Sequence, residues 1–247
     1  MTLSAEQRAA YARTGHLTVP GVFTPAEIDA AVADIQAWGE EFLSHLSPQE
    51  RAWYVDGGVK AQSVLRKLDN PVFHRASVRK LAENRKLVDL VEDFIGKGVC
   101  VTFSQIFFKP PHGGGPKPVH QDNYYFGPQD PERIITAWVA LDDATPENGC
   151  LQFAEGTNLG PVYPHVAPPG EPFNLQVPAE VARRFAMTHA PVPKGGVSFH
   201  HGNTFHQSGD NHSPRWRRAA AIHYLANDNH FATPGLPYDK GVIVRVS

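Results

Sequence analysis

Two residues, His120 and Asp122, could bind a metal ion from one face of a strand expected over residues 119–123. Successive side chains of a strand point to opposite faces, so an imidazole and a carboxylate two positions apart point the same way. They would supply two ligands of the 2-His-1-carboxylate arrangement, which leaves positions open on non-haem Fe(II). The third ligand must be a distant histidine, and His206 is the best candidate. The alternative is that His-x-Asp occurs by chance on a surface strand.

A fixed positive charge is predicted near His206. Residues 208–214 are rich in turn formers, so we expect the chain to reverse there and return as a strand beginning near Arg217. On such a hairpin Arg217 would lie beside the metal, where a guanidinium group suits bidentate binding of a carboxylate. The alternative is an arginine on the surface of the strand, which is the role we assign to Arg215 and Arg218.

The composition is that of an ordinary folded protein and excludes several classes. A chain of 247 residues can bury one core, and contents of 41% hydrophobic and 19% charged residues exclude a disordered chain. A net charge of −2 offers no basic surface for nucleic acid or an anionic membrane. Cys100 and Cys150 are too few for a disulfide framework, and no apolar run resembles a signal peptide or a membrane span. We expect a cytoplasmic monomer or small homo-oligomer whose partner is a small-molecule substrate.

Residues 1–96 are predicted to be mostly helical. A helix is expected over residues 5–14, followed by a short strand over 16–19. The sequence Thr24-Pro-Ala-Glu is a capping box with proline at the first helical position, and it predicts a helix that ends near residue 46. A further helix is expected over residues 78–95.

After residue 96 the pattern changes to short strands separated by turns. Besides the strand at 119–123, strands are expected at 100–108, 133–141, 150–154, 197–201 and 217–225. Residues 155–195 are irregular apart from a short helix at 178–185, and a loop of this length is typical of a functional lid. The pattern predicts one mainly β domain, 1–247, in which residues 97–247 form a double-stranded β-helix (jelly roll, cupin-like) buttressed by the N-terminal helices.

In their order and spacing, several motifs resemble those of the phytanoyl-CoA dioxygenase family of Fe(II)/2-oxoglutarate-dependent oxygenases. The resemblance covers nearly the whole chain. It rests on Gly15-His-Leu-Thr-Val-Pro-Gly-Val-Phe with the helix after Thr24, Lys109-Pro-Pro, His120-Gln-Asp, the strand around Trp138, Asn148-Gly-Cys-Leu, Gly156-Thr-Asn, His206-x-Ser and Trp216-Arg217.

The resemblance implies roles for the matched residues. His120, Asp122 and His206 would be the iron ligands, and Arg217 with Ser208 would hold the far carboxylate of 2-oxoglutarate. Fe(II), 2-oxoglutarate and O2 would then be the cofactor and cosubstrates. The protein's part would be to position the substrate and exclude competing reductants, because the oxidising chemistry belongs to the metal.

Three further contacts with 2-oxoglutarate are implied, by Trp138, Gln105 and Lys67. Each has a simpler alternative, since Trp138 could fill the core, Gln105 stands where some family members have an apolar residue, and Lys67 could be solvated. Residues 123–126 follow the metal strand and could line the substrate entrance, as could parts of the 155–195 loop.

The resemblance implies an enzyme that hydroxylates an unactivated C–H bond of a small metabolite and releases succinate and CO2. Asp122 argues against the related halogenases, in which a small residue replaces the carboxylate. Desaturation or another oxidative rearrangement at the same site stays open. Two alternatives do not use 2-oxoglutarate: a metal-dependent cupin-like enzyme, which would not need Arg217, and a jelly-roll binding module, which would be expected to have lost a ligand. No basic cluster resembles a coenzyme A phosphate site.

Overall fold

The computed structural model describes residues 1–56, 64–168 and 174–247. Its helices are α1 Ala5–Thr14, α2 Pro25–His45, α3 Pro48–Tyr54, α4 Pro71–His74, α5 Ala76–Ala82, α6 Arg85–Ile95, α7 Asp122–Phe126 and α8 Ala179–Ala182. Its strands are β1 His16–Val19, β2 Val55–Asp56, β3 Val64–Leu65, β4 Lys67–Asp69, β5 Val99–Lys109, β6 Lys117–His120, β7 Ile134–Ala140, β8 Leu151–Phe153, β9 Thr188–Ala190, β10 Val197–His201, β11 His206–Ser208, β12 Arg217–Ala226 and β13 Val244–Arg245.

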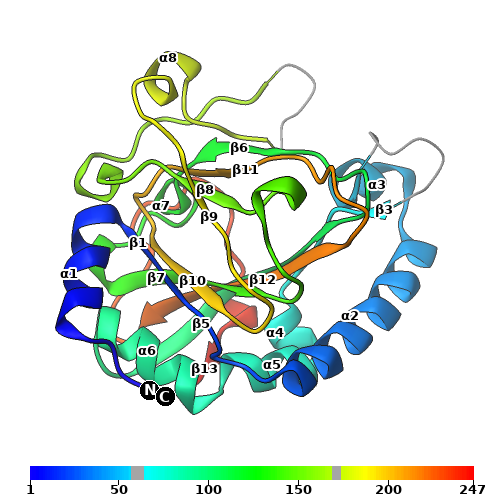
Figure 1. Cartoon of the computed structure of the whole chain (residues 1–247), viewed down its shortest axis with the longest axis horizontal. Coiled ribbons are helices and arrows are strands. Elements are labelled where there is room, and N and C mark those ends of the chain that lie inside the picture. Colours follow the sequence, from blue (N-terminus) through cyan, green and yellow to red (C-terminus); the bar gives the residue numbers. More distant parts are fainter. Residues whose placement is uncertain (57–63, 169–173) are drawn as a thin grey trace.

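Two antiparallel sheets face each other, and helices cover the outer face of one of them (Figure 1). The larger sheet has the strand order β1-β10-β7-β12-β5-β13, with β4 also paired to β5. The smaller sheet has the order β6-β11-β8-β9. In Figure 1 the larger sheet lies between the smaller sheet and helices α5 and α6. This arrangement is the predicted jelly roll buttressed by N-terminal helices.

Local signals set most of the helix boundaries. Thr24 and Glu27 form the predicted capping box, and α2 ends at His45, close to the expected position. The single helix predicted over 78–95 is two helices, because Glu83 ends α5 and the Asn84 side chain accepts a hydrogen bond from the Lys86 backbone N–H to begin α6. None of the helices in the described ranges has both the length and the apolar content needed to cross a lipid bilayer.

Alternation along the central strands separates the two faces of the larger sheet. On β7, Ile135, Ala137 and Val139 pack into the core beneath the helices, whereas Trp138 and Ala140 belong to a second core between the sheets. Strand β12 divides in the same way, so its alanines at 219 and 221 face the smaller sheet. Both faces are therefore buried, and the face toward the smaller sheet (the inner face) is where polar side chains can gather.

Two parts of the chain join the sheets in ways that the sequence did not predict. Strands β1 and β4, from the N-terminal part expected to be mostly helical, pair with β10 and β5 of the larger sheet. Strand β9 lies in the segment expected to be irregular and pairs with β8. The helix predicted at 178–185 is shorter, Ala179–Ala182.

The segment after β12 packs against the end of α7. The backbone N–H groups of Ala232 and Thr233 donate to the Gly127 carbonyl at 2.8 and 3.0 Å, and the Gly235 N–H donates to the Tyr125 carbonyl at 3.1 Å. Gly127 has a φ of 50°, and a Cβ there would lie 2.0 Å from the Thr233 carbonyl oxygen. Only glycine allows this close approach.

Candidate metal centre

Three buried side chains, His120, Asp122 and His206, converge between the two sheets. One ligand atom of each lies within 4.8 Å of the other two, and this is the one such group that the described residues contain. Asp122 Oδ1 lies 3.8 Å from His120 Nε2 and 3.6 Å from His206 Nε2. Two imidazole nitrogens and one carboxylate oxygen on one side of a site are the donor set of the facial triad.

The pairing of β6 with β11 brings the two histidines together, because His206 is directly opposite His120 in the register. The predicted strand at 119–123 is wrong in its extent: β6 ends at His120, and Asp122 is the first residue of α7. Gln121 between them keeps extended angles, with φ −124° and ψ 128°. One extended residue is enough to point its two neighbours to the same side, so the inferred convergence holds.

Backbone carbonyls fix the orientation of both imidazole rings. His120 Nδ1 lies 2.8 Å from the Pro118 carbonyl oxygen, and His206 Nδ1 lies 3.0 Å from that of Thr204. A carbonyl oxygen only accepts, so each Nδ1 carries the proton and each Nε2 presents a lone pair toward the centre. Burial, followed by the nearby His206 and Lys117, lowers the pKa of His120 well below its ordinary value, which favours the neutral form that a metal requires.

The larger sheet holds the second oxygen of Asp122. Oδ2 accepts hydrogen bonds from Thr136 Oγ1 at 2.6 Å and from His200 Nε2 at 3.1 Å, while His223 Nδ1 lies 2.8 Å from Thr136 Oγ1. Burial alone would raise the pKa of Asp122, but His206 and the hydrogen bond from His200 hold it well below its ordinary value. The carboxylate therefore stays charged and presents Oδ1 to the centre.

Thr136, His200 and His223 were not predicted from the sequence. A usable signal was present for Thr136, which precedes Trp138 by two residues and so shares its face of β7. Which of the many histidines would reach Asp122 depends on the pairing of distant strands.

Arg217 is a buried cation on the inner face of the larger sheet. Its side chain is 2% exposed, Nε has no hydrogen-bond partner, and no carboxylate of the described residues lies within 4.0 Å of it. Burial lowers the pKa of this guanidinium to about 10, and its carbon lies 5.6 Å from the centre of the Trp138 ring. A buried arginine without an anion is an energetic cost unless a ligand supplies the charge.

The predicted hairpin between His206 and Arg217 is wrong. Strand β11 lies in the smaller sheet and β12 in the larger, where Arg217 is opposite Lys109. Ser208, which is two residues after His206 on β11, is buried as well. The chain therefore crosses from one sheet to the other, and the two sheets contribute these side chains separately.

Lys67 and Gln105 share one carboxylate, that of Asp69. Lys67 Nζ lies 2.9 Å from Asp69 Oδ2, and Gln105 Nε2 donates to Asp69 Oδ1 at 2.7 Å. Strand β4 places Asp69 opposite Gln105 on β5. Both predicted contact residues thus have a partner within the protein, and this pairing was not predicted from the sequence.

Residues 155–168 and 174–195, here called the lid, are hydrogen bonded to the metal-bearing segment. The Gln121 side chain donates to the Pro161 and Asn203 carbonyls at 3.0 and 2.8 Å and accepts from the Tyr163 N–H at 2.9 Å. The Gln121 N–H donates to His165 Nε2 at 2.9 Å. Gln121, which lies between His120 and Asp122, therefore hydrogen bonds the lid to the metal-bearing segment.

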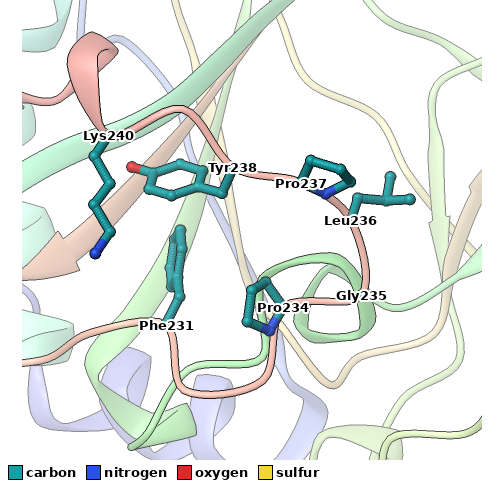
Figure 2. A pocket seen from close by; sticks show the side chains of 7 residues that line it. All are labelled: Phe231, Pro234, Gly235, Leu236, Pro237, Tyr238 and Lys240. Atoms are coloured by element: carbon teal, nitrogen blue, oxygen red, sulfur yellow. The ribbon is translucent and has the colours of Figure 1, made fainter.

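Two surface hollows lie apart from the three converging side chains. Figure 2 shows the first, in the segment after β12, lined by Phe231, Pro234, Gly235, Leu236, Pro237, Tyr238 and Lys240. The second is lined partly by Asn123 and Tyr124, with Val162 of the lid. Phe126, expected near the entrance, instead packs in an apolar cluster with Ile134 and Leu225.

Comparison with known proteins gives a consistent picture. Residues 11–219 match the sequence profile of the family described as phytanoyl-CoA dioxygenase. A probable alpha-ketoglutarate-dependent hypophosphite dioxygenase of Stutzerimonas stutzeri is 28% identical over 91% of this chain and 79% of its own length. The peroxisomal phytanoyl-CoA dioxygenase of Bos taurus is 25% identical over 93% of this chain and 70% of its own.

Solved structures share the fold. The non-haem alpha-ketoglutarate-dependent carbocyclase SnoK from nogalamycin biosynthesis superposes with a TM-score of 0.79, at 22% identity, over 99% of this chain and 97% of its own. EctD from S. alaskensis, solved with 2-oxoglutarate and 5-hydroxyectoine, gives a TM-score of 0.74 at 22% identity, over 94% of this chain and 79% of its own.

Proposed function

The chain belongs to the phytanoyl-CoA dioxygenase family, and on that premise we propose that it hydroxylates a C–H bond of a small metabolite. It is a non-haem Fe(II)/2-oxoglutarate-dependent oxygenase, and enzymes of this family act on small-molecule substrates. With Fe(II) and 2-oxoglutarate bound, the site would supply the O2-dependent oxidising chemistry, with succinate and CO2 as products.

In this proposal His120, Asp122 and His206 hold the iron. Their fit to the metal is supported by the chemistry of the donor set, because both Nε2 lone pairs and one carboxylate oxygen face a common point while the remaining polar atoms are hydrogen bonded. The hydrogen bonds of Thr136 and His200 leave one Asp122 oxygen for the metal, so the carboxylate would bind through a single oxygen.

Arg217 holds the far carboxylate of 2-oxoglutarate, assisted by Ser208, with Trp138 as the wall of that pocket. The observation that carries this assignment is the buried guanidinium without an anion beside it. A carboxylate there would gain a charge-assisted hydrogen bond and relieve the cost of burying the cation. Lys67 and Gln105 are proposed as further contacts of 2-oxoglutarate, and both side chains are also paired with Asp69.

The cupin-like alternative without a 2-oxo acid is disfavoured by the same arginine. An enzyme that needs only the metal gains nothing from a buried, unpaired guanidinium, which costs stability. Desaturation and rearrangement use the same residues, so they remain alternatives to hydroxylation. Cys100 and Cys150 are free and buried, which supports a reducing cytoplasm, and we propose a monomer or small homo-oligomer of one catalytic domain.

The substrate is proposed to be small. The names of the relatives include a hypophosphite dioxygenase and phytanoyl-CoA dioxygenases, which indicates that the family accommodates very different molecules. The net charge of −2 and the lack of a basic cluster in the sequence that resembles a coenzyme A phosphate site favour a small metabolite over an acyl-CoA.

A cosubstrate assay tests the function. The purified protein is loaded anaerobically with Fe(II), binding of 2-oxoglutarate is measured by calorimetry, and succinate is then followed after O2 is admitted, with a panel of small metabolites that includes hypophosphite. We expect iron-dependent binding of 2-oxoglutarate and slow succinate formation that a substrate accelerates. Absence of 2-oxoglutarate binding by the iron-loaded protein would contradict the proposal.

A further inference from the structure

Lys117 is a second cation on the face that carries the metal triad, although its position in the sequence suggests otherwise. It precedes His120 by three residues, and strict alternation would place the two side chains on opposite faces of β6. In the pairing with β11, however, His206 is opposite His120 and Ser208 is opposite Lys117. Two steps along β11 thus match three along β6. This bulge turns Lys117 to the face of His120, and bulges re-aim side chains in this way beside active sites.

The Lys117 ammonium group lies beside Tyr125, which is on α7, three residues after Asp122. Nζ is 3.5 Å from Tyr125 Oη and 5.7 Å from the centre of its ring. The Tyr125 ring is in turn 6.0 Å from the His120 ring, and its hydroxyl donates to the Leu175 carbonyl of the lid at 3.1 Å. Tyr125 therefore contacts the ammonium group, the His120 ring and the lid.

No carboxylate of the described residues is paired with this ammonium group, although Asp122 is near enough to raise its pKa. No carboxylate oxygen lies within 4.0 Å of Lys117 Nζ, whereas the nearby Lys67 is paired with Asp69 at 2.9 Å. Burial, followed by Lys67 and Arg66, lowers the pKa of Lys117 to about 8. Burial also raises the pKa of Tyr125 and lowers that of His165 to about 4, so neither neighbour carries charge near pH 7.

The charges of the cosubstrate are already matched in the proposed function. 2-Oxoglutarate carries two negative charges. One is matched by Arg217, and the other by the iron dication, whose charge Asp122 reduces to one. Lys67 is neutralised by Asp69. The charge of Lys117 is matched by neither the cosubstrate nor Asp69, so it can bind another ligand.

We propose that Lys117, held by Tyr125, binds an anionic group of the primary substrate, either a carboxylate or a phosphorus oxyanion. This inference rests on the proposed function and names the substrate class of that site. An ammonium group can donate up to three hydrogen bonds and suits a rounded oxyanion as well as a carboxylate. The anion would anchor the substrate beside the lid and leave its reacting bond toward the metal.

Small probes test the subsite in the complete enzyme. Wild-type protein is loaded anaerobically with Fe(II) and 2-oxoglutarate, and butyrate, methylphosphonate and the neutral butyramide are titrated separately. Relaxation of the probe protons by the paramagnetic iron reports binding and proximity without turnover. We expect butyrate or methylphosphonate to bind at least about tenfold more tightly than butyramide, and the anion that binds identifies which of the two oxyanion types the site takes.

Variants separate this role from the others. Lys117→Met should lose about tenfold or more in anion affinity while its affinity for 2-oxoglutarate stays within about twofold, and Lys117→Arg should retain anion binding and thereby control for folding. Lys194→Met, which removes a surface lysine paired with Asp29, should change nothing. Failure of both butyrate and methylphosphonate to bind the wild type more tightly than butyramide overturns the inference. So does a tenfold loss of 2-oxoglutarate affinity in Lys117→Met, which would assign Lys117 to the cosubstrate. Failure of the wild type to bind 2-oxoglutarate would instead overturn the proposed function itself, and the inference with it.

Discussion

The two sheets of this enzyme contribute different kinds of residue to the site. The smaller sheet, whose strands β6, β8, β9 and β11 are three or four residues long, carries His120 and His206. The larger sheet contains strands of up to eleven residues, and its outer face forms the main core. Its inner face supplies Thr136 and His200, which are hydrogen bonded to Asp122, and the buried Arg217, to which we assign the far carboxylate of the cosubstrate.

The difference shows how a short, weakly paired sheet can hold a metal site to a defined geometry. Few ladder hydrogen bonds fix β6 and β11, and the rings of their two histidines are oriented by the nearby backbone carbonyls of Pro118 and Thr204. The third ligand, Asp122, is held by Thr136 and His200 of the long strands, where burial on both faces leaves little freedom of movement. Changes in the smaller sheet should therefore remove function with little loss of stability, and changes on the inner face of the larger sheet should affect the two separately.

The largest effect is expected from His206→Ala. Loss of a metal ligand should reduce Fe(II) affinity by more than the ten- to hundredfold typical of losing a supporting hydrogen bond. The main core lies on the other side of the larger sheet, so the fold should be retained. Fe(II) binding and far-UV circular dichroism measure the two effects. His212→Ala, at an exposed position in the same stretch of chain, is the control and should bind iron normally.

Arg217→Met should separate stability from cosubstrate binding. Removal of the partner of a buried carboxylate should weaken 2-oxoglutarate by about a hundredfold or more. The same change removes an unpaired buried charge, so the protein without cosubstrate should become more stable, by about 1–4 kcal/mol. Calorimetric binding and thermal unfolding test both parts.

The neighbouring Arg218→Met is the matched control for Arg217. Arg218 is paired with Asp142 at 2.7 Å, so its replacement should cost stability and leave 2-oxoglutarate affinity unchanged. If both arginine variants behaved alike, the contrast between the inner and outer faces of β12 would be incorrect.

Thr136→Val should have a smaller effect, of about tenfold, on Fe(II) affinity. The substitution keeps the shape of the side chain but removes the hydrogen bond to Asp122 Oδ2. Thr102→Val is the control, because this buried threonine donates to the His223 carbonyl and not to the carboxylate. Iron affinities of the two variants that could not be distinguished would show that the larger sheet does not orient Asp122.

A separate effect, outside the binding of metal and cosubstrate, concerns docking of the lid at low pH. His165 accepts a hydrogen bond from the Gln121 N–H through Nε2, and burial lowers its pKa to about 4. The docked form thus requires a neutral ring, so docking is complete above the ordinary value of about 6.5 and weakens as the pH falls toward 4, by up to about tenfold per pH unit. Hydrogen exchange of residues 155–168 between pH 7.5 and 5 measures this change. His165→Gln keeps an acceptor that does not titrate and should abolish the dependence.

The parts of the fold that the sequence predicted are those with strong local signals. The capping box at Thr24 and Glu27 set the start of α2, and the nearly continuous apolar runs of β7 and β12 located the central strands. The helix break at Asn84 was missed because the apolar pattern continues across it. Strands β4 and β9 are each three residues long and pair with β5 and β8. A strand of three residues has too little periodicity to be recognised in the sequence.

The candidate site was predictable in its residue types but not in all of its geometry. His120, Asp122 and His206 follow from spacing and chemistry, and the structure brings them together. The contacts of Thr136 with Asp122 and of Asp69 with Gln105 join residues that only the paired strands bring near. Lys117 was missed for another reason, since the bulge in β6 breaks the period of two on which the facing of side chains is inferred.

The segment after β12 has a consequence for how this enzyme tolerates truncation. Its backbone is bonded to Gly127 and Tyr125, immediately behind the helix that begins with Asp122. The match to the family profile ends at residue 219, before the segment that follows β12. A chain shortened to Ala226 would keep most of both sheets and lose the support of its carboxylate ligand. Iron retention in this protein is thus expected to depend partly on a segment beyond the residues that the family profile matches.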